Sequence, residues 1–176
     1  YEQILRDLQS AGNAGEFYTP RAITSFIIDR LNPRLDEVVL DPACGTGGFL
    51  TCAIRHMREH YVKKPADEKK MQSALRACEK KQLPHMLCVT NMLLHGIEDP
   101  SFVRHDNTLA RPYISYGASD KVEIVLTNPP FGGQEEDGVE SNFPAHFRTR
   151  ETADLFLALI VRLLKPGGRA AVVLPD

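Results

Sequence analysis

The sequence predicts an α/β fold, doubly wound around a mostly parallel sheet, in a single domain over residues 1–176. Short, continuously apolar strand candidates alternate with amphipathic helix candidates, which is typical of a parallel sheet covered by helices on both faces. Two strands end in a polar residue at a sharp turn, Asp41 before a run of glycines and Asn128 before two prolines. The length of 176 residues is that of one ordinary domain.

The composition is that of a folded protein, with 43% hydrophobic and 25% charged residues. The formal net charge of -2 lacks the basic footprint of an independent nucleic-acid-binding protein, so action on DNA or RNA requires a partner that helps to hold it. No apolar run approaches the roughly 20 residues of a membrane span, and residues 1–8 lack the features of a signal peptide. The 4 cysteines form no C-x-x-C pair, so we expect buried thiols and a reducing cytoplasm.

The first elements are predicted from helical spacing and capping signals. Apolar residues at helical spacing predict a short helix within residues 1–10. Thr19 and Pro20 are typical of an N-cap and a first helical position, and an amphipathic pattern continues from there to Leu31. The Asn-Pro pair at 32–33 ends this helix.

The remaining elements continue the alternation. They are, in chain order, a strand over 38–40 that leads into Asp41, a helix over 48–60, a charged and solvated link over 63–70, a weakly patterned strand over 74–79, a helix over 84–95 with a C-cap signal at Gly96, a strand over 102–106, a buried strand over 122–126, a helix over 152–164 stopped by 166–168, and a strand over 170–174. Residues 132–151 are polar and exceed the usual length of a connection, so we expect a mobile loop there. Because an apolar last strand would leave a bare sheet edge, we expect further strands to follow it in a longer parent protein.

Two patterns on the predicted helices are interpreted as structural. Met86, Met92, Leu93 and Leu94 are interpreted as a stripe that faces the core. Residues 56–60 spell H-x-x-E-H, an inverted zinc-protease pattern. No third ligand is evident, so we interpret these residues as the solvated face of a helix and expect no metal site.

A glycine-rich turn joins the strand that ends at Asp41 to the next helix, and it reads Asp-Pro-Ala-Cys-Gly-Thr-Gly-Gly-Phe over 41–49. Glycines here let a ligand approach the backbone, and ligands bind at the carboxyl ends of strands in open parallel sheets. Leu50 stands where the dinucleotide fingerprint needs a glycine, and no G-x-x-x-x-G-K-[ST] loop is present. Asp41 therefore favours a nucleotide-like ligand with a cationic or hydroxyl group over a pyrophosphate. The alternative is a plain tight turn.

The clearest strand, 122–126, leads into Asn128-Pro129-Pro130-Phe131. The exocyclic amine of a nucleobase is a poor nucleophile because its lone pair is delocalised into the ring. The side-chain oxygen of Asn128 and the backbone oxygen of Pro129 can accept its two hydrogens and turn the lone pair toward an electrophile. Phe131 can stack on a base that has been removed from its duplex. The alternative is an ordinary proline turn with a core phenylalanine.

Three motifs stand in a fixed order, namely Gly-Glu-Phe-Tyr-Thr-Pro over 15–20, the glycine-rich turn over 41–49 and Asn-Pro-Pro-Phe-Gly over 128–132. Together they resemble the motifs of N6-adenine DNA methyltransferases, and within these the modification subunits of Type I restriction-modification systems. The resemblance covers nearly the whole chain and implies a Rossmann-like fold that uses S-adenosylmethionine. Such subunits also carry an N-terminal helical region and further C-terminal strands, so the resemblance implies the central piece of a larger protein.

The resemblance implies roles for individual residues. The catalytic motif would consist of Asn128, Pro129, Pro130 and Phe131. Contacts with S-adenosylmethionine are implied for Glu16, Phe17, Tyr18, Thr19, Pro20, Arg21, Asp41, Pro42, Ala43, Cys44, Gly45, Thr46, Gly47, Gly48, Glu79, Asp106 and Asn128. In this set Glu79 would bind the ribose and Asp106 the adenine of the cofactor. The alternatives are a surface charge cluster at Glu79 and a turn cap at Asp106.

The implied reaction is direct transfer of a methyl group from S-adenosylmethionine to N6 of adenine in double-stranded DNA. The catalytic tetrapeptide contains no cysteine, which disfavours a covalent route through a ring carbon. The implied partners are a specificity subunit and a restriction subunit, in the cytoplasm of a prokaryote. The acidic run 135–137 is interpreted as a solvated loop, near enough to Phe131 to act as a lid over the target base. Two alternatives stay open: a transferase acting on a protein glutamine or on RNA, and a catalytically silent module that binds the donor and a partner.

Overall fold

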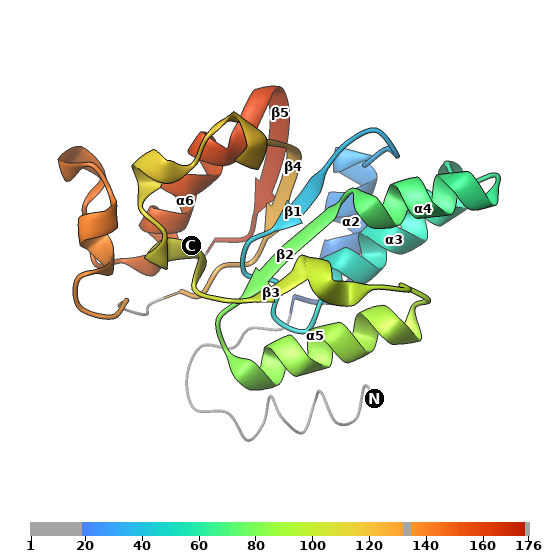
Figure 1. Cartoon of the computed structure of the whole chain (residues 1–176), viewed down its shortest axis with the longest axis horizontal. Helices are drawn as coiled ribbons and strands as arrows, with labels where there is room; N and C mark the ends of the chain where they lie inside the picture. The colour runs from blue at the N-terminus through green and yellow to red at the C-terminus, as the bar shows by residue number, and fades with distance from the viewer. Residues whose placement is uncertain (1–18, 132–134, 175–176) are drawn as a thin grey trace.

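The computed structural model describes residues 19–131 and 135–174, so the helix predicted within 1–10 lies outside the described residues. The described chain forms a five-stranded parallel sheet with the strand order β3-β2-β1-β4-β5 (Figure 1). Its strands are β1 (Val39–Asp41), β2 (Leu75–Glu79), β3 (Val103–His105), β4 (Val122–Thr127) and β5 (Leu164–Val172). The order reverses between β1 and β4, and in open parallel sheets such a switch point opens a crevice at the carboxyl ends of the strands.

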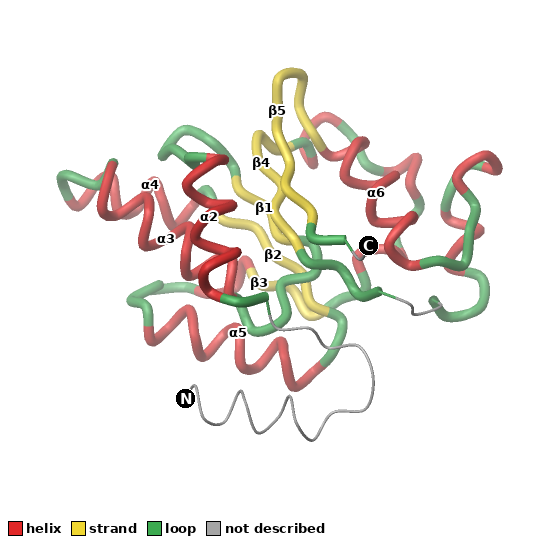
Figure 2. The backbone as a smooth tube through the Cα atoms, turned by 180° about the vertical axis from the view of Figure 1, so that it is seen from behind, coloured by secondary structure: helices red, strands yellow, loops and turns green. Residues whose placement is uncertain are grey.

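Helices cover both faces of the sheet (Figure 2). One side carries α2 (Arg21–Leu31), α3 (Gly48–His60), α4 (Pro65–Ser73) and α5 (Gln82–Leu94), and the other carries α6 (Thr152–Leu163). Side chains alternate along the strands, so Val39 and Leu126 pack into the core with α2 and α3, whereas Leu40 and Val125 pack with Ile160 of α6. Burial on both faces explains the apolar strands and confirms the predicted doubly wound α/β class.

Most elements lie where the sequence predicts them. α3 has the predicted bounds, and the ends of β1, β2, α5, β3, β4 and α6 lie within two residues of the predicted ones. Gly96 follows the C-cap of α5 with φ +75°, the left-handed conformation that a glycine adopts easily. All 4 cysteines are free and buried, as expected.

The predicted solvated link over 63–70 is wrong, because α4 occupies Pro65–Ser73. A proline in the first turn is preorganised for a helix. The carboxylate of Asp67 accepts the backbone N–H of Lys64 at 3.2 Å, which satisfies one donor at the helix start. Met71 is buried against the main core, so one apolar side chain anchors an otherwise polar helix.

Two further boundaries differ from the prediction. Pro20 is the N-cap residue of α2 and not its first helical residue. β5 begins at Leu164 and passes through 166–168, where the sequence suggested a break, and only its last three residues coincide with the predicted strand over 170–174. A strand that pairs on one side tolerates a proline, because its outer N–H groups have no ladder partner to lose.

The apolar stripe predicted on α5 is only partly buried. Met92 is fully buried, whereas Met86, Leu93 and Leu94 are each more than half exposed, so their interpretation as core residues is wrong. α5 packs beside β2 and β3, at the end of the sheet, and only one narrow side of the helix faces those strands.

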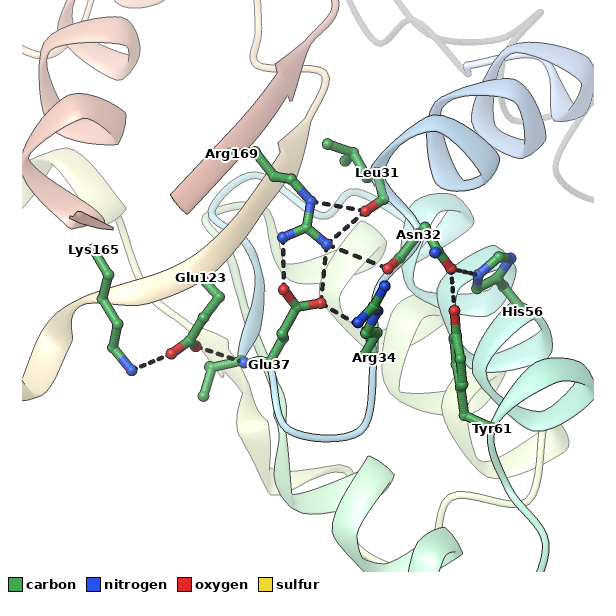
Figure 3. A network of polar contacts seen from close by, with 10 residues as sticks. Leu31, Asn32, Arg34, Glu37, His56, Tyr61, Glu123, Lys165 and Arg169 are labelled. Atoms are coloured by element: carbon green, nitrogen blue, oxygen red, sulfur yellow. Dashed lines mark hydrogen bonds and ion pairs between the residues drawn. The ribbon is translucent and has the colours of Figure 1, made fainter. Parts of the chain in front are cut away.

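The segment 56–60 is not wholly solvated, contrary to the prediction. His56 and Met57 are buried, and Nε2 of His56 lies 2.9 Å from Oδ1 of Asn32 (Figure 3). The same oxygen accepts a hydrogen bond from the hydroxyl of Tyr61. Burial is the main reason why the pKa of His56 is lowered, so the ring is a neutral packing element that joins α3 to the end of α2.

Arg169 of β5 ties the last strand to the first half of the chain (Figure 3). Its guanidinium forms two bonds to the carboxylate of Glu37, at 2.6 and 2.9 Å, and Nε donates to the carbonyl of Leu31 at 2.8 Å. The hydrogen bond from Arg169 is the main cause of a lowered pKa at Glu37. β5 is therefore attached both to β4 and to the end of α2.

The described part of the loop after residues 128–131 contains local structure of its own. Residues 135–151 contain two short 3-10 turns, Val139–Asn142 and Ala145–Phe147. Phe143 is buried in the cluster that also contains Leu109 and residues of α6. The mobility expected of this loop stays a prediction.

Candidate functional site at the carboxyl ends of the strands

Four of the predicted site residues lie at or just after the carboxyl ends of adjacent strands. Asp41 ends β1, Glu79 ends β2, Asp106 follows β3 and Asn128 follows β4. Parallel pairing brings these ends to one edge, and the switch point lies between the β1 and β4 members. The structure thus gathers residues that are up to 87 positions apart in the chain (128 minus 41).

The turn after β1 requires its glycines for two different reasons. Gly45 and Gly47 have φ of +53° and +86°, in the left-handed region that other residues rarely adopt. A Cβ atom on Gly47 would lie 2.9 Å from Sγ of Cys88 and 3.1 Å from Cε of Met92, so α5 leaves no room for a side chain. Within the part of the chain that the structure describes, no such neighbour lies within 4 Å of Gly45, so open space adjoins the backbone there.

Hydrogen bonds hold this turn from two sides. The hydroxyl of Thr108 donates to the carbonyl of Pro42 at 2.7 Å, and Nδ2 of Asn91 donates to the carbonyl of Thr46 at 3.0 Å. Both donors are buried polar side chains, and the sequence analysis did not single them out. The sequence does contain an indication that Asn91 is a buried hydrogen-bonding residue, because it is a polar residue within an apolar helical pattern. The turn is therefore a preorganised element whose carbonyl groups are already engaged.

Asp41 is a buried acid, 1% exposed. Burial raises its pKa to about 7, and the charge of Glu79 acts in the same direction, whereas the nearby Thr127 hydroxyl and a hydrogen bond from the backbone of Ala43 oppose the shift. The Ala43 N–H donates to Oδ1 at 3.2 Å. A carboxyl group of this kind exchanges a proton near neutral pH and can accept hydrogen bonds from an incoming cationic or hydroxyl group.

Glu79 is also buried, and both of its carboxylate oxygens bind backbone N–H groups. Oε2 accepts from Gly45 at 2.9 Å and Oε1 accepts from Lys81 at 2.8 Å. This corrects the alternative of a surface charge cluster at Glu79. Asp106 is exposed, and its Oδ1 accepts the N–H of Asn107 at 2.8 Å, as in a turn cap.

Asn128 is joined to the first motif. Its Nδ2 donates to the hydroxyl oxygen of Thr19 at 3.0 Å. The bond orients the amide with its nitrogen toward Thr19, and the oxygen is the acceptor end of the same rigid plane. Pro129 is buried, whereas Pro130 is exposed and Phe131 is half-buried. Part of the tetrapeptide is therefore packed in the protein and part of it is accessible to solvent.

The remaining site predictions are placed in part. Glu16, Phe17 and Tyr18 lie outside the described residues. Arg21 is exposed and lines a cavity of about 310 Å³ together with Arg55 and other side chains of α3, apart from the glycine-rich turn. The individual site roles stay predictions.

The part of the chain that the structure describes shows neither a metal-binding cluster nor a membrane-spanning helix. No group of three or more His, Cys, Asp or Glu side chains within 19–131 and 135–174 is placed to hold a metal ion. In the same residues no helix is long and apolar enough to cross a membrane.

Known proteins resemble this chain in sequence and in structure. The N-6 DNA Methylase family matches residues 1–176. The chain is 64% identical, over all of its 176 residues, to 36% of the methylase subunit of the Type I restriction enzyme EcoEI from Escherichia coli. It is also 34% identical, again over its whole length, to 34% of the EcoKI methylase subunit from Escherichia coli K12.

Solved structures agree with these relatives. A modification subunit assigned to a type I restriction enzyme of Vibrio vulnificus YJ016 superposes with a TM-score of 0.88 at 48% identity, over 98% of this chain and 37% of that one. The EcoKI M protein superposes with a TM-score of 0.78 at 33% identity, over 91% of this chain and 34% of that one. The chain spans about a third of the length of the proteins that it matches.

The sheet order and the strand-end site define a Rossmann-like methyltransferase domain, which confirms the predicted fold class. The chain belongs to the N-6 DNA methylase family. This confirms the resemblance drawn from its three motifs.

Proposed function

We propose that the chain is the methyltransferase core of a site-specific DNA adenine methylase in a Type I restriction-modification system. It would transfer a methyl group from S-adenosylmethionine to N6 of adenine. The observation that carries the proposal is the Asn128 amide, which follows β4 at the switch point and is bonded to Thr19 of the first motif. The Type I methylase subunits to which the chain is similar support the same reaction.

The residues around the glycine-rich turn fit the proposed donor. Among residues 19–131 and 135–174, no heavy atom lies within 4 Å of a Cβ atom built on Gly45 or Gly48. The carboxyl groups of Asp41 and Glu79 flank the turn and are suited to the ammonium and hydroxyl groups of S-adenosylmethionine. When bound, this cofactor supplies an electrophilic methyl group on a sulfonium sulfur.

The catalytic motif fits an adenine amine as the acceptor. Oδ1 of Asn128 and the carbonyl oxygen of Pro129 would accept its two N–H groups, which frees the nitrogen lone pair for in-line attack. Phe131 would stack on the face of the extruded base. The protein would contribute positioning and hydrogen bonding, without a covalent enzyme intermediate.

The surface charge supports a dependence on partners. A formal net charge of -2 gives little attraction for the phosphate backbone, so we propose that a specificity subunit supplies most of the grip on DNA. A restriction subunit of the same system, in a prokaryotic cytoplasm, would complete the set of partners.

The first experiment is a calorimetric titration of the protein with S-adenosylmethionine, with NAD as the control ligand. We expect saturable binding of S-adenosylmethionine alone. NAD binding, or no binding of either ligand by a chain that circular dichroism shows to be folded, would argue against the proposed donor site.

The acceptor is tested with tritiated S-adenosylmethionine and the assembled methylase. Label is expected in DNA, as N6-methyladenine after nuclease digestion. Label in protein glutamine or in RNA would favour the alternative acceptors. Donor binding without transfer to any of them would favour a silent assembly module.

A further inference from the structure

The side chain of Glu135 is largely shielded from solvent, although it lies in an acidic run that its sequence suggests is solvated. Its side chain is 9% exposed, whereas Glu136 and Asp137 are 74% and 93% exposed. The interpretation is therefore wrong for Glu135 and right for its two neighbours. A carboxylate gives up solvation only where partners compensate for it, so the contacts of Glu135 indicate what holds it there.

The carboxylate of Glu135 bridges two other strand ends. Its Oε2 lies 3.1 Å from Nζ of Lys80 and accepts a hydrogen bond from Nδ2 of Asn107 at 3.2 Å. Lys80 immediately follows Glu79, the proposed ribose ligand, and Asn107 immediately follows Asp106, the proposed adenine ligand. One side chain beyond the catalytic motif is therefore bonded to the direct neighbours of two proposed donor ligands.

Both partners of Glu135 are themselves held in place. The carbonyl of Lys80 lies 3.1 Å from Nε2 of His105, which links the turn after β2 to β3. Oδ1 of Asn107 accepts the N–H of Leu109 at 2.9 Å, so both ends of its amide are engaged. Each partner of Glu135 is tied to its own strand end, so hydrogen bonds connect Glu135 to the ends of both β2 and β3.

The charges of Lys80 and Glu135 also favour their contact. Burial disfavours the ammonium form of Lys80, yet the hydrogen bonds that it donates to Glu136 and Glu135 raise its pKa overall. Lys80 is thus a cation shared by Glu135 at 3.1 Å and Glu136 at 3.0 Å, and of these two carboxylates only that of the less exposed Glu135 also binds Asn107.

We propose that Glu135 is a positioning residue that couples the donor site to the target-adenine site. This inference rests on the proposed function. A donor that contacts Glu79 and Asp106 orders the turns that carry Lys80 and Asn107, and these turns hold Glu135 and the chain beyond the catalytic motif. Thermodynamic linkage makes the coupling reciprocal, so bound DNA must tighten donor binding by the same factor by which the donor tightens DNA binding.

The test compares donor affinity with and without DNA in the assembled methylase. The probe is S-adenosylhomocysteine, the demethylated donor, which allows no turnover, and the DNA is a duplex that the wild-type enzyme methylates. We expect the duplex to lower the Kd of the wild type for S-adenosylhomocysteine by about 5-fold or more, as is typical of coupled sites. In Glu135→Ala the ratio of the two Kd values is expected to fall to about 1, with the Kd in the absence of DNA little changed.

Two further variants distinguish a loss of coupling between the sites from a general disturbance of the loop structure. Asp137→Ala removes a carboxylate from the same run, two residues away, whose side-chain partner is the exposed Arg150, and it is expected to keep the wild-type ratio. Glu135→Gln keeps an acceptor for Asn107 and Lys80 and is expected to recover most of the ratio.

Each outcome has one meaning. A wild-type ratio of 1, or an unchanged ratio in Glu135→Ala, overturns the coupling. A reduced ratio in Asp137→Ala equal to that in Glu135→Ala overturns the specific role of Glu135. Failure of the wild-type enzyme to methylate adenine in any duplex refutes the proposed function instead, and is seen before any variant is made.

Discussion

The side-chain nitrogen of Asn128 donates a 3.0 Å hydrogen bond to the hydroxyl oxygen of Thr19, across 109 residues of sequence. The bond joins Thr19, which lies just before the N-cap residue of α2, to the residue that follows β4. The bond holds the amide nitrogen toward Thr19 and so sets the orientation of the amide plane. Thr19 therefore contributes to the orientation of the Asn128 amide, which we propose to be catalytic.

Replacing Thr19 by Val removes this hydroxyl and lets the Asn128 amide rotate. We expect the single-turnover methylation rate of the assembled enzyme to fall by about 10- to 100-fold, because small misplacements near reacting atoms are costly. Thr19→Ser keeps the hydroxyl and should stay close to the wild-type rate. Equal rates in the Val and Ser variants would show that the hydrogen bond has no role.

Asn128→Ala removes an acceptor that the proposed reaction needs. We expect the methylation rate to fall by about 100-fold or more, since such groups typically contribute 100- to 10,000-fold. The Kd for S-adenosylmethionine should change little, which calorimetry can measure. Full activity in this variant would refute the assignment of the catalytic motif.

Asp41 makes stability depend on pH in a definite direction. Its pKa is raised to about 7, mainly by burial, so the folded protein retains a proton that the unfolded chain releases above about pH 4. The free energy of unfolding therefore falls as pH rises from about 4 to 7. In Asp41→Asn this loss is absent, so the variant should gain on the wild type between pH 5 and pH 8 by at most roughly 3 kcal/mol.

Urea denaturation at the two pH values measures the gain. The same substitution should weaken binding of S-adenosylmethionine, because it removes a charged acceptor. An unchanged Kd would refute the role of Asp41 in donor binding, whatever happens to stability.

Comparing Gly47→Ala with Gly45→Ala distinguishes a glycine needed for packing against α5 from one needed for access of the ligand to the turn. Both place a side chain at positive φ, but only Gly47 also has Cys88 Sγ 2.9 Å from the added Cβ. We expect Gly47→Ala to lower the free energy of unfolding by about 2 to 4 kcal/mol and Gly45→Ala by about 1 to 2 kcal/mol. Gly45→Ala should nevertheless impair donor binding, because it fills the open space beside the turn. Equal losses of stability would contradict the packing argument.

Arg169→Ala should destabilise the fold by about 1 to 3 kcal/mol, since it removes the partner of the half-buried Glu37 and a donor to Leu31. Arg169 lowers the pKa of Glu37, so this contribution is present at neutral pH and is lost as pH falls through the acid range where Glu37 becomes protonated. The difference between variant and wild type in urea denaturation should therefore shrink toward pH 3. Arg150→Ala, which removes an exposed ion pair, is the control and should cost less than about 1 kcal/mol.

The sequence predicts best where a local pattern and the tertiary structure act together. The bounds of α3 follow from the glycine-rich turn before it and from its apolar spacing, both of which are local. Glu79 was harder to place, because the alternation in β2 is weak and lysines follow it. Its role in the turn becomes visible only through the bond to Gly45, which lies 34 residues away.

Predictions fail where the deciding contact is distant. α4 has little apolar pattern, and its anchor is a single methionine packed against the main core. Met86, Leu93 and Leu94 have helical spacing, but the position of α5 at the end of the sheet leaves them exposed. The burial of Glu135 depends on Lys80, 55 positions earlier, so no local pattern distinguishes it from the exposed acids beside it.

The bonds from Arg169 to Leu31 and Glu37 span 138 and 132 residues, so they form only after nearly all of this sequence has emerged from the ribosome. Until then the end of α2 and the loop before β1 have their partners only in part, and β4 has an unpaired side that β5 will later cover. Contacts of such high sequence separation slow folding, because the chain loses the entropy of closing a long loop before the contacts can stabilise it. A nascent chain that is arrested before residue 164 should therefore be sensitive to proteolysis around residues 31–37, and this sensitivity should disappear once β5 is complete.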